Sequence, residues 1–122
     1  MRKNACMLEN PISANQMYAP IARGKMVKSK KYNLWIEKNL PLVKEQMEVI
    51  ESFPINLEIM ILANHLWRMK HDSDNLVKPL IDLLVKAEII PDDTSRYIEN
   101  ISVRYLYMPG PPTVRISYDF VE

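Results

Sequence analysis

Residues 55–63 read Ile-Asn-Leu-Glu-Ile-Met-Ile-Leu-Ala, and this stretch decides the fold. Every second side chain in it is apolar, while the positions between them are mixed. This period of two predicts a β-strand whose apolar face lies on a hydrophobic core. Pro54 precedes the strand and marks its start.

The segment that follows this strand predicts a helix over residues 75–88, capped by Ser73 or Asp74. Its apolar side chains recur every three to four residues and form one broad stripe, which indicates a largely buried helix. The stripe consists of Leu76, Val77, Leu80, Ile81, Leu83, Leu84 and Ala87. Pro79 removes one backbone donor in the second turn, so some local distortion is expected there.

The N-terminal half predicts a strand, a long loop and a helical region. Residues 5–9 form the short strand, and residues 11–28, rich in Pro, Ser, Asn and Gly, form the loop. Loops of this length are uncommon in a small domain and tend to be functional or disordered. The pattern then becomes helical, and Pro41 predicts either a kink or two helices, over residues 30–39 and 41–51.

Two further strands are predicted over residues 97–108 and 113–121, where apolar and polar positions alternate again. The Pro- and Gly-containing stretch 108–112 turns the chain, so the two strands are expected to form an antiparallel hairpin. The elements together predict an α/β chain of the α+β kind. Residues 1–122 are expected to form one small domain, a mixed β-sheet with an antiparallel C-terminal hairpin packed against helices.

Length and composition fit a globular protein with a single core. The chain has 122 residues, of which 48% are apolar and 25% charged, values that are typical of such domains. Cys6 is the only cysteine, so no internal disulfide can form and a reducing, cytoplasmic location is expected. No apolar run approaches the roughly 20 residues that span a bilayer, so no membrane partner is expected.

Carboxylates gather where the central strand gives way to the helix. Residues 71–78 read His-Asp-Ser-Asp-Asn-Leu-Val-Lys. Asp72 and Asp74 lie two residues apart and can present oxygens to one cation. Lys78 follows Asp74 by four residues, so it falls on the same helix face one turn further on.

A second acidic pair, Asp92-Asp93, follows the helix. A sheet packed on the helix can return Asp93 to the first pair, so that three carboxylates converge beside Lys78. Oxygen-rich groups of this kind hold Mg²⁺ or Mn²⁺. Carboxylates this close repel one another without a cation, which raises their pKa values. A metal site is therefore the economical interpretation.

Such a site suits hydrolysis of a nucleic-acid backbone. A bound divalent cation activates a water and stabilises charge on the phosphate. Lys78 can stabilise the developing negative charge or orient the water. His65 and His71 are weaker candidates for acid–base roles, because each also fits a phosphate contact or a packed side chain.

Other interpretations of the Asp-Ser-Asp-Asn run are weaker. An EF-hand loop needs an oxygen ligand at its fifth position and Gly at its sixth, where this chain has Leu76 and Val77. Phosphotransferases with an aspartyl nucleophile place the Asp pair directly after a buried strand, whereas polar residues precede it here. A sugar-nucleotide transferase needs a much longer chain. The structural alternative is a helix-capping Asp together with Lys78 in a salt bridge.

The net charge is only +1, but the basic residues are clustered. One group lies within residues 23–31, free of acids, and comprises Arg23, Lys25, Lys28, Lys30 and Lys31. A second group runs into the first Asp pair and comprises His65, Arg68, Lys70 and His71. A protein that is nearly neutral overall can carry a positive stripe suited to a nucleic-acid backbone. A merely solvated loop is the alternative for the first group.

The run from Asp72 to Leu83, followed by Asp92-Asp93, resembles the RusA family of Holliday junction resolvases. Members of that family carry an Asp-x-Asp-Asn-Leu-x-Lys run, a helix, and an Asp-Asp pair before a strand. A supporting match lies near the N-terminus, where the family's Pro-x-Ser-x-Asn-x-x-Tyr loop corresponds to Pro11, Ser13, Asn15 and Tyr18. The chain departs from the family at Glu88, where relatives often have a Gly-containing turn.

The resemblance implies an α/β homodimer that cleaves four-way DNA junctions with Mg²⁺ or Mn²⁺. It assigns the metal to Asp72, Asp74 and Asp93, and it makes Lys78 the essential lysine beside them. A dimer suits paired symmetric nicks, because a two-fold junction requires two sites related by a two-fold axis. The residues expected to contact the DNA backbone are Arg23, Lys25, Lys28, Lys30, Arg68 and Lys70.

The sequence therefore predicts a metal-dependent endodeoxyribonuclease that resolves Holliday junctions by paired symmetric phosphodiester hydrolysis. It would serve recombination, repair or phage DNA processing. A non-catalytic branched-DNA-binding protein of the same fold, whose acids act as caps and salt-bridge partners, is the alternative. Dependence on Mg²⁺ separates the two, because only the enzyme needs the cation.

Overall fold

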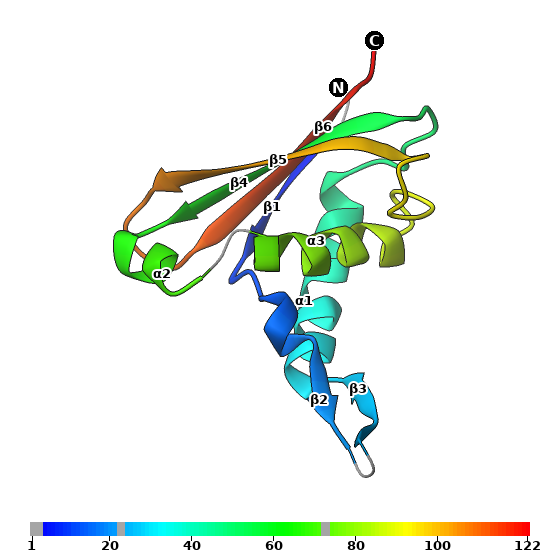
Figure 1. Ribbon diagram of the computed structural model, residues 1–122. Coiled ribbons are helices and arrows are strands. Elements are labelled where there is room, and N and C mark those ends of the chain that lie inside the picture. Colours follow the sequence, from blue (N-terminus) through cyan, green and yellow to red (C-terminus); the bar gives the residue numbers. More distant parts are fainter. Residues whose placement is uncertain (1–3, 22–23, 72–73) are drawn as a thin grey trace.

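A computed structural model describes residues 4–21, 24–71 and 74–122 of the chain, except for the side chain of Asp74. Figure 1 shows its elements, which follow one another in the order β1 (Ala5–Glu9), the 3₁₀ turn η1 (Ala14–Gln16), β2 (Tyr18–Pro20), β3 (Met26–Lys28), α1 (Lys30–Gln46), β4 (Ile55–Ala63), α2 (His65–Met69), α3 (Asp74–Lys86), β5 (Ile98–Tyr107) and β6 (Thr113–Phe120). The mixture of strands and helices confirms the α+β class.

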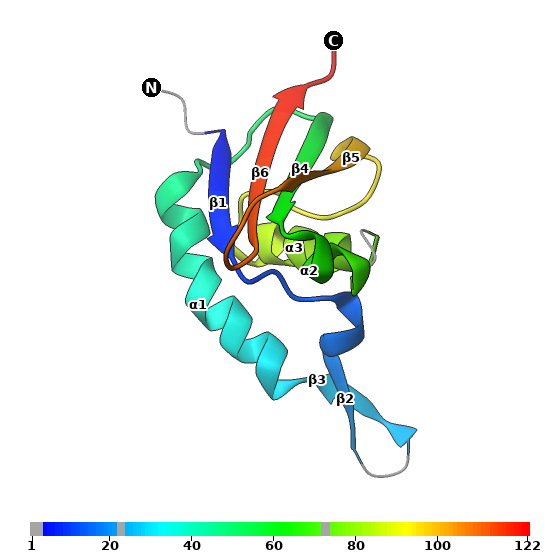
Figure 2. The ribbon, with the colours of Figure 1, turned by 90° about the vertical axis from the view of Figure 1, so that its left-hand side faces the viewer.

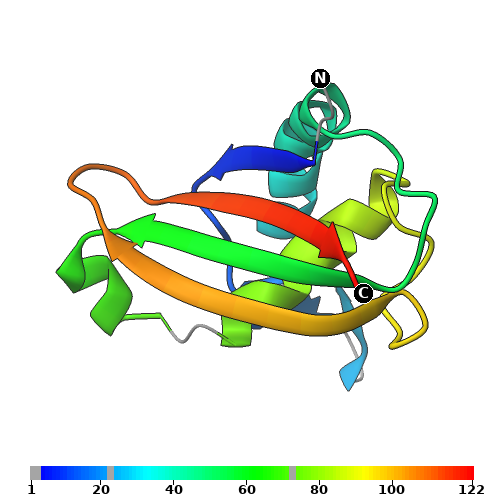
Figure 3. The same cartoon turned by 90° about the horizontal axis from the view of Figure 1, so that it is seen from above.

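Four strands form one mixed sheet in the order β1-β6-β4-β5 (Figure 3). The strand β4, which decided the fold, lies inside this sheet. It pairs antiparallel with β6 and parallel with β5, and β6 pairs antiparallel with β1. No helix in the described ranges has both the length and the apolar character needed to cross a bilayer.

The core lies on one face of the sheet. The side chains at alternate positions of β4, from Ile55 to Ala63, are buried, and those between them are only half-buried. Both α1 and α3 lie on the shielded face (Figure 1), and Figure 3 shows the opposite face without a helix over it in the described part of the chain. The period of two in the sequence therefore separates a core face from an outer face.

The buried stripe of α3 agrees with the sequence pattern. Leu76, Leu80, Leu83 and Leu84 are completely buried, and each such leucine contributes roughly 1.5–3 kcal/mol of transfer free energy. The helix runs unbroken through Pro79, which is itself buried. Tertiary packing of this face outweighs the single backbone hydrogen bond that the proline removes.

The predicted C-terminal hairpin is wrong in its pairing. The chain does turn between β5 and β6, at Gly110 with a φ of +93°, but β4 lies between these two strands in the sheet. An alternating pattern shows which side of a strand faces the core, yet it does not identify the neighbouring strand. As an edge strand, β5 leaves Ile101 39% and Tyr107 61% exposed.

Three local predictions are also corrected. The loop over residues 11–28 contains η1 and the antiparallel pair β2–β3, which projects away from the sheet (Figure 2). The two helices predicted around Pro41 are one continuous helix that ends at Gln46, because Pro41 is exposed and water can bind the carbonyl it leaves free. The helix α2 forms where the sequence predicted only a basic connection.

Candidate active site

Helix α3 carries the central part of the acidic motif. It begins at Asp74, and the exposed side chain of Lys78 lies one turn further along. Asp82 follows after another turn, so Lys78 and Asp82 share one face of the helix. Because the leucine stripe fixes the rotation of α3 on the sheet, this polar face is held away from the core.

The segment between α3 and β5 brings the second acidic pair to the same face. Ile89 is buried, and its N–H donates a 3.0 Å hydrogen bond to the carbonyl of Leu84. This bond and the buried side chain fix the direction in which the chain leaves the helix. Asp92 and Asp93 follow shortly afterwards, both exposed.

One open hollow of about 400 Å³ brings these groups together. Its charged lining consists of Lys78, Asp82, Asp92 and Asp93, and its apolar wall consists of Val77, Ile81, Val85 and Ile101. Lys78 and Asp93 thus line the same hollow, as the sequence predicted. Asp93 lies ahead of β5, which begins at Ile98, and not at the start of that strand.

Asp92 and Asp93 differ in their hydrogen bonding. The Oδ1 atom of Asp92 accepts a 2.8 Å bond from the N–H of Asp93, so this oxygen is already engaged. The Asp93 carboxylate accepts no bond from any described residue. Of the pair, Asp93 therefore has the carboxylate that is available to a ligand.

Asp82 was not predicted as a site residue, although it belongs to the conspicuous run that ends at Leu83. Its Oδ2 atom lies 3.7 Å from the Nζ atom of Lys28 on β3. The same ammonium lies 4.7 Å from the ring centroid of Tyr18 and 4.6 Å from that of Tyr32. Lys28, predicted to contact DNA, is thus held between two rings and a carboxylate. The available signal was the spacing of four residues between Lys78 and Asp82.

The other basic residues predicted to bind DNA lie in two separate parts of the chain. Lys25 and Lys30 flank β3, and their side chains are exposed. Arg68 and Lys70 lie on and after α2, and the Arg68 guanidinium stacks over the Tyr105 ring at 4.7 Å. Stacking orients the Arg68 guanidinium without neutralising its charge.

Two predicted site residues, Asp72 and Arg23, lie outside the described residues. Within the described residues, no group of three or more His, Cys, Asp or Glu side chains is close enough to hold a metal ion. The described carboxylates of the hollow supply oxygen, which is the ligand type that Mg²⁺ prefers, and those of Asp92 and Asp93 are exposed. The chemistry of the donor set therefore fits the expected cation, with Asp93 as its described member.

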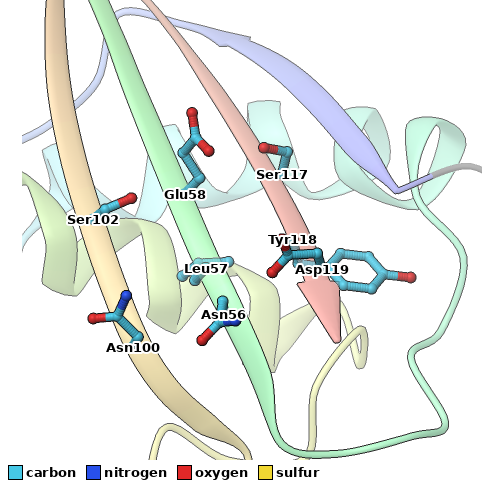
Figure 4. Close-up of a pocket in the computed structure, with 8 residues that line it drawn as sticks. All are labelled: Asn56, Leu57, Glu58, Asn100, Ser102, Ser117, Tyr118 and Asp119. Atoms are coloured by element: carbon cyan, nitrogen blue, oxygen red, sulfur yellow. The ribbon is translucent and has the colours of Figure 1, made fainter. Parts of the chain in front are cut away.

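A second polar hollow, of about 280 Å³, lies on the uncovered face of the sheet (Figure 4). Its polar lining comes from β4, β5 and β6 and consists of Asn56, Glu58, Asn100, Ser102, Ser117 and Asp119. Glu58 accepts a 3.2 Å bond from Nη2 of Arg104. This hollow contains none of the predicted site residues, so the candidate active site stays beside α3.

Comparison with known proteins adds no assignment. No protein-family model matches the chain, and no curated protein sequence matches it.

Proposed function

We propose that this chain is a Mg²⁺-dependent endodeoxyribonuclease that resolves four-way DNA junctions by paired symmetric cleavage. The observation that carries the proposal is the shared hollow of Lys78 and Asp93, placed beside the helix that begins at Asp74. A lysine and a free carboxylate at this place are the groups that the sequence motif requires.

The residues have distinct roles in this proposal. Asp72, Asp74 and Asp93 hold the cation, which when bound activates water and stabilises charge on the phosphate. Lys78 donates hydrogen bonds to a phosphate oxygen as negative charge develops there. Asp92 holds the backbone of Asp93 through its bond to the Asp93 N–H.

The DNA strand is positioned by the exposed basic residues. Lys25, Lys30, Arg68 and Lys70 contact phosphates, which fixes the position of the backbone without reading its sequence. Lys28 contributes less, because its ammonium already lies near Asp82. A homodimer supplies two such sites across the two-fold axis of a four-way junction.

A cleavage assay tests the proposal. A synthetic four-way junction, a duplex, a flap and a single strand are incubated with the chain, with and without Mg²⁺. Symmetric paired nicks are expected on the junction alone and only with Mg²⁺. Light scattering should give the mass of a dimer of the 14.3 kDa chain.

The neighbouring pair Asp93→Asn and Asp92→Asn provides a matched control. We expect Asp93→Asn to abolish cleavage while junction binding persists, because removing a negative charge does not weaken attraction to phosphate. Asp92→Asn should retain most of the activity, because an amide oxygen can still accept the hydrogen bond from the Asp93 N–H.

Three outcomes would contradict parts of the proposal. Loss of junction binding together with cleavage in Asp93→Asn would remove the assigned metal role. Junction binding without cleavage in Mg²⁺ or Mn²⁺ would favour the non-catalytic branched-DNA-binding protein. Equal cutting of every substrate would leave a nuclease that does not select junctions.

A further inference from the structure

A hollow of about 330 Å³ lies between the N-terminal segment, α1 and α2. It falls within the roughly 300–1,000 Å³ typical of small-ligand sites. Both tryptophans of the chain, Trp35 and Trp67, line it. The remaining described lining consists of Asn10, Pro11, Ile12, Gln16, Lys31, His71 and Pro112.

The aromatic rings of this hollow are held in place. The Nε1 atom of Trp35 donates a 3.0 Å bond to the carbonyl of Asn10. The His71 ring stacks on Trp67 with centroids 3.9 Å apart and an interplanar angle of 13°, and His71 Nδ1 lies 2.8 Å from the Trp67 carbonyl. Because these rings are already oriented, a ligand that stacks on them loses little binding free energy to the ordering of side chains.

The polar groups of the hollow favour an anionic ligand. None of its described lining residues is acidic, and Lys31 supplies an exposed positive charge. The Gln16 Oε1 atom lies near the Ser13 amide and hydroxyl, while its Nε2 group has no partner among the described residues. This lining contrasts with the hollow beside α3, where three carboxylates accompany one lysine.

Flat rings, a side-chain amide and a lysine match the base and the phosphate of a nucleotide. A base stacks on aromatic rings, an amide bonds to its edge, and an ammonium attracts its phosphate. We propose that this hollow binds an unpaired nucleobase of a DNA strand, stacked at Trp67 with its phosphate near Lys31. The inference rests on the proposed function, because a nuclease that acts on branched DNA is what brings a DNA strand with unpaired bases to this chain.

Tryptophan emission tests the proposal, because both reporters lie in the hollow. A thymidine hexamer and an abasic hexamer with the same phosphates are titrated into the chain without Mg²⁺. The thymidine hexamer should quench the emission and bind more tightly, whereas the abasic hexamer should bind through its phosphates alone. Equal quenching and equal affinity for the two oligonucleotides would overturn the base site.

A matched pair of variants separates ring stacking from general folding. Trp67→Ala should weaken binding of the thymidine hexamer by roughly 5- to 150-fold, as loss of a base-stacking ring does. Trp67→Phe keeps an aromatic ring and should recover most of that affinity. Trp35 remains as the reporter in both, and circular dichroism checks that they fold. Unchanged affinity in a folded Trp67→Ala chain would overturn the proposal.

The two proposals fail separately. A chain that cleaves junctions but shows no base-dependent quenching overturns the base site alone. A chain that is quenched only by the oligonucleotide with bases, yet cleaves nothing in Mg²⁺, supports the base site and overturns the nuclease.

Discussion

At the scale of single residues, Lys28 and Asp82 show how tertiary contacts change an assignment. Lys28 lies in a basic segment and is therefore predicted to contact DNA, whereas the sequence pattern assigns no role to Asp82. Their 3.7 Å approach joins β3 to α3, and no local pattern predicts which distant carboxylate a lysine meets. Both side chains are about one-third exposed, so the pair contributes at most about 1 kcal/mol.

Cys6 provides a prediction about pH at the same scale. Burial raises the pKa of its thiol from 9.0 to about 11, because the thiolate is poorly solvated inside the protein. The unfolded chain releases this proton near the ordinary pKa, so the folded state binds it more tightly. The contribution to stability is therefore complete below about pH 9 and is lost as the pH rises toward 11.

We expect the free energy of unfolding to fall more steeply between about pH 9 and 11 in the natural chain than in Cys6→Ala. The difference should reach about 3 kcal/mol, since two pKa units correspond to that amount. Urea unfolding at several pH values measures it. Identical pH dependence in both chains would show that the buried thiol is not responsible.

At the scale of elements, α3 is the segment that the sequence predicted best. We expect Leu80→Ala to lower the free energy of unfolding by about 2–5 kcal/mol, because it leaves a cavity in a fully buried stripe. Leu34→Ala on α1 is the matched control, since Leu34 is 55% exposed, and its effect should stay within about 0.5 kcal/mol. Denaturant titration of both variants measures the two changes. Similar losses of unfolding free energy in Leu80→Ala and Leu34→Ala would contradict the assigned burial.

Elements with a strongly periodic pattern of apolar side chains could be predicted from the sequence. The pairing of strands within the sheet could not. The strand at residues 55–63 and the helix α3 follow from side-chain spacing alone. The hairpin of residues 97–121 failed because β4 inserts between its strands, which depends on the whole sheet. The helix α2 was missed because five residues are too few for a helical period to be visible.

At the scale of the whole molecule, the hollow beside α3 and the hollow lined by Trp35 and Trp67 differ in how far the sequence could reveal them. The one beside α3 was anticipated, because Lys78 and Asp93 belong to segments joined by a short connection. The one lined by Trp35 and Trp67 combines four segments that are distant along the chain. These segments come together only through the packing of α1 and α2 against the N-terminal segment. The spacing of residues in the sequence does not predict that packing.

The sheet order predicts the effect of a truncation on the whole fold. We expect a chain that ends at Pro112 to remain unfolded, because β6 pairs with both β1 and β4. Without it, β1 loses its only sheet neighbour. A chain that ends at Phe120 keeps every strand and should fold. Amide hydrogen exchange compares the two, and protected amides in the shorter chain would contradict the prediction.

The position of β6 also bears on how the protein is made. Synthesis proceeds from the N-terminus, so β1, β4 and β5 leave the ribosome before the strand that must separate β1 from β4. The parallel pair β4–β5 can form early, and α1, which contacts β1 and bonds to Met7 through Gln46, also precedes β6 in the chain. Among the described residues, however, β1 has no strand partner in the sheet until residues 113–120 emerge. We therefore expect the sheet to be completed late, when β6 pairs with β1 on one side and β4 on the other.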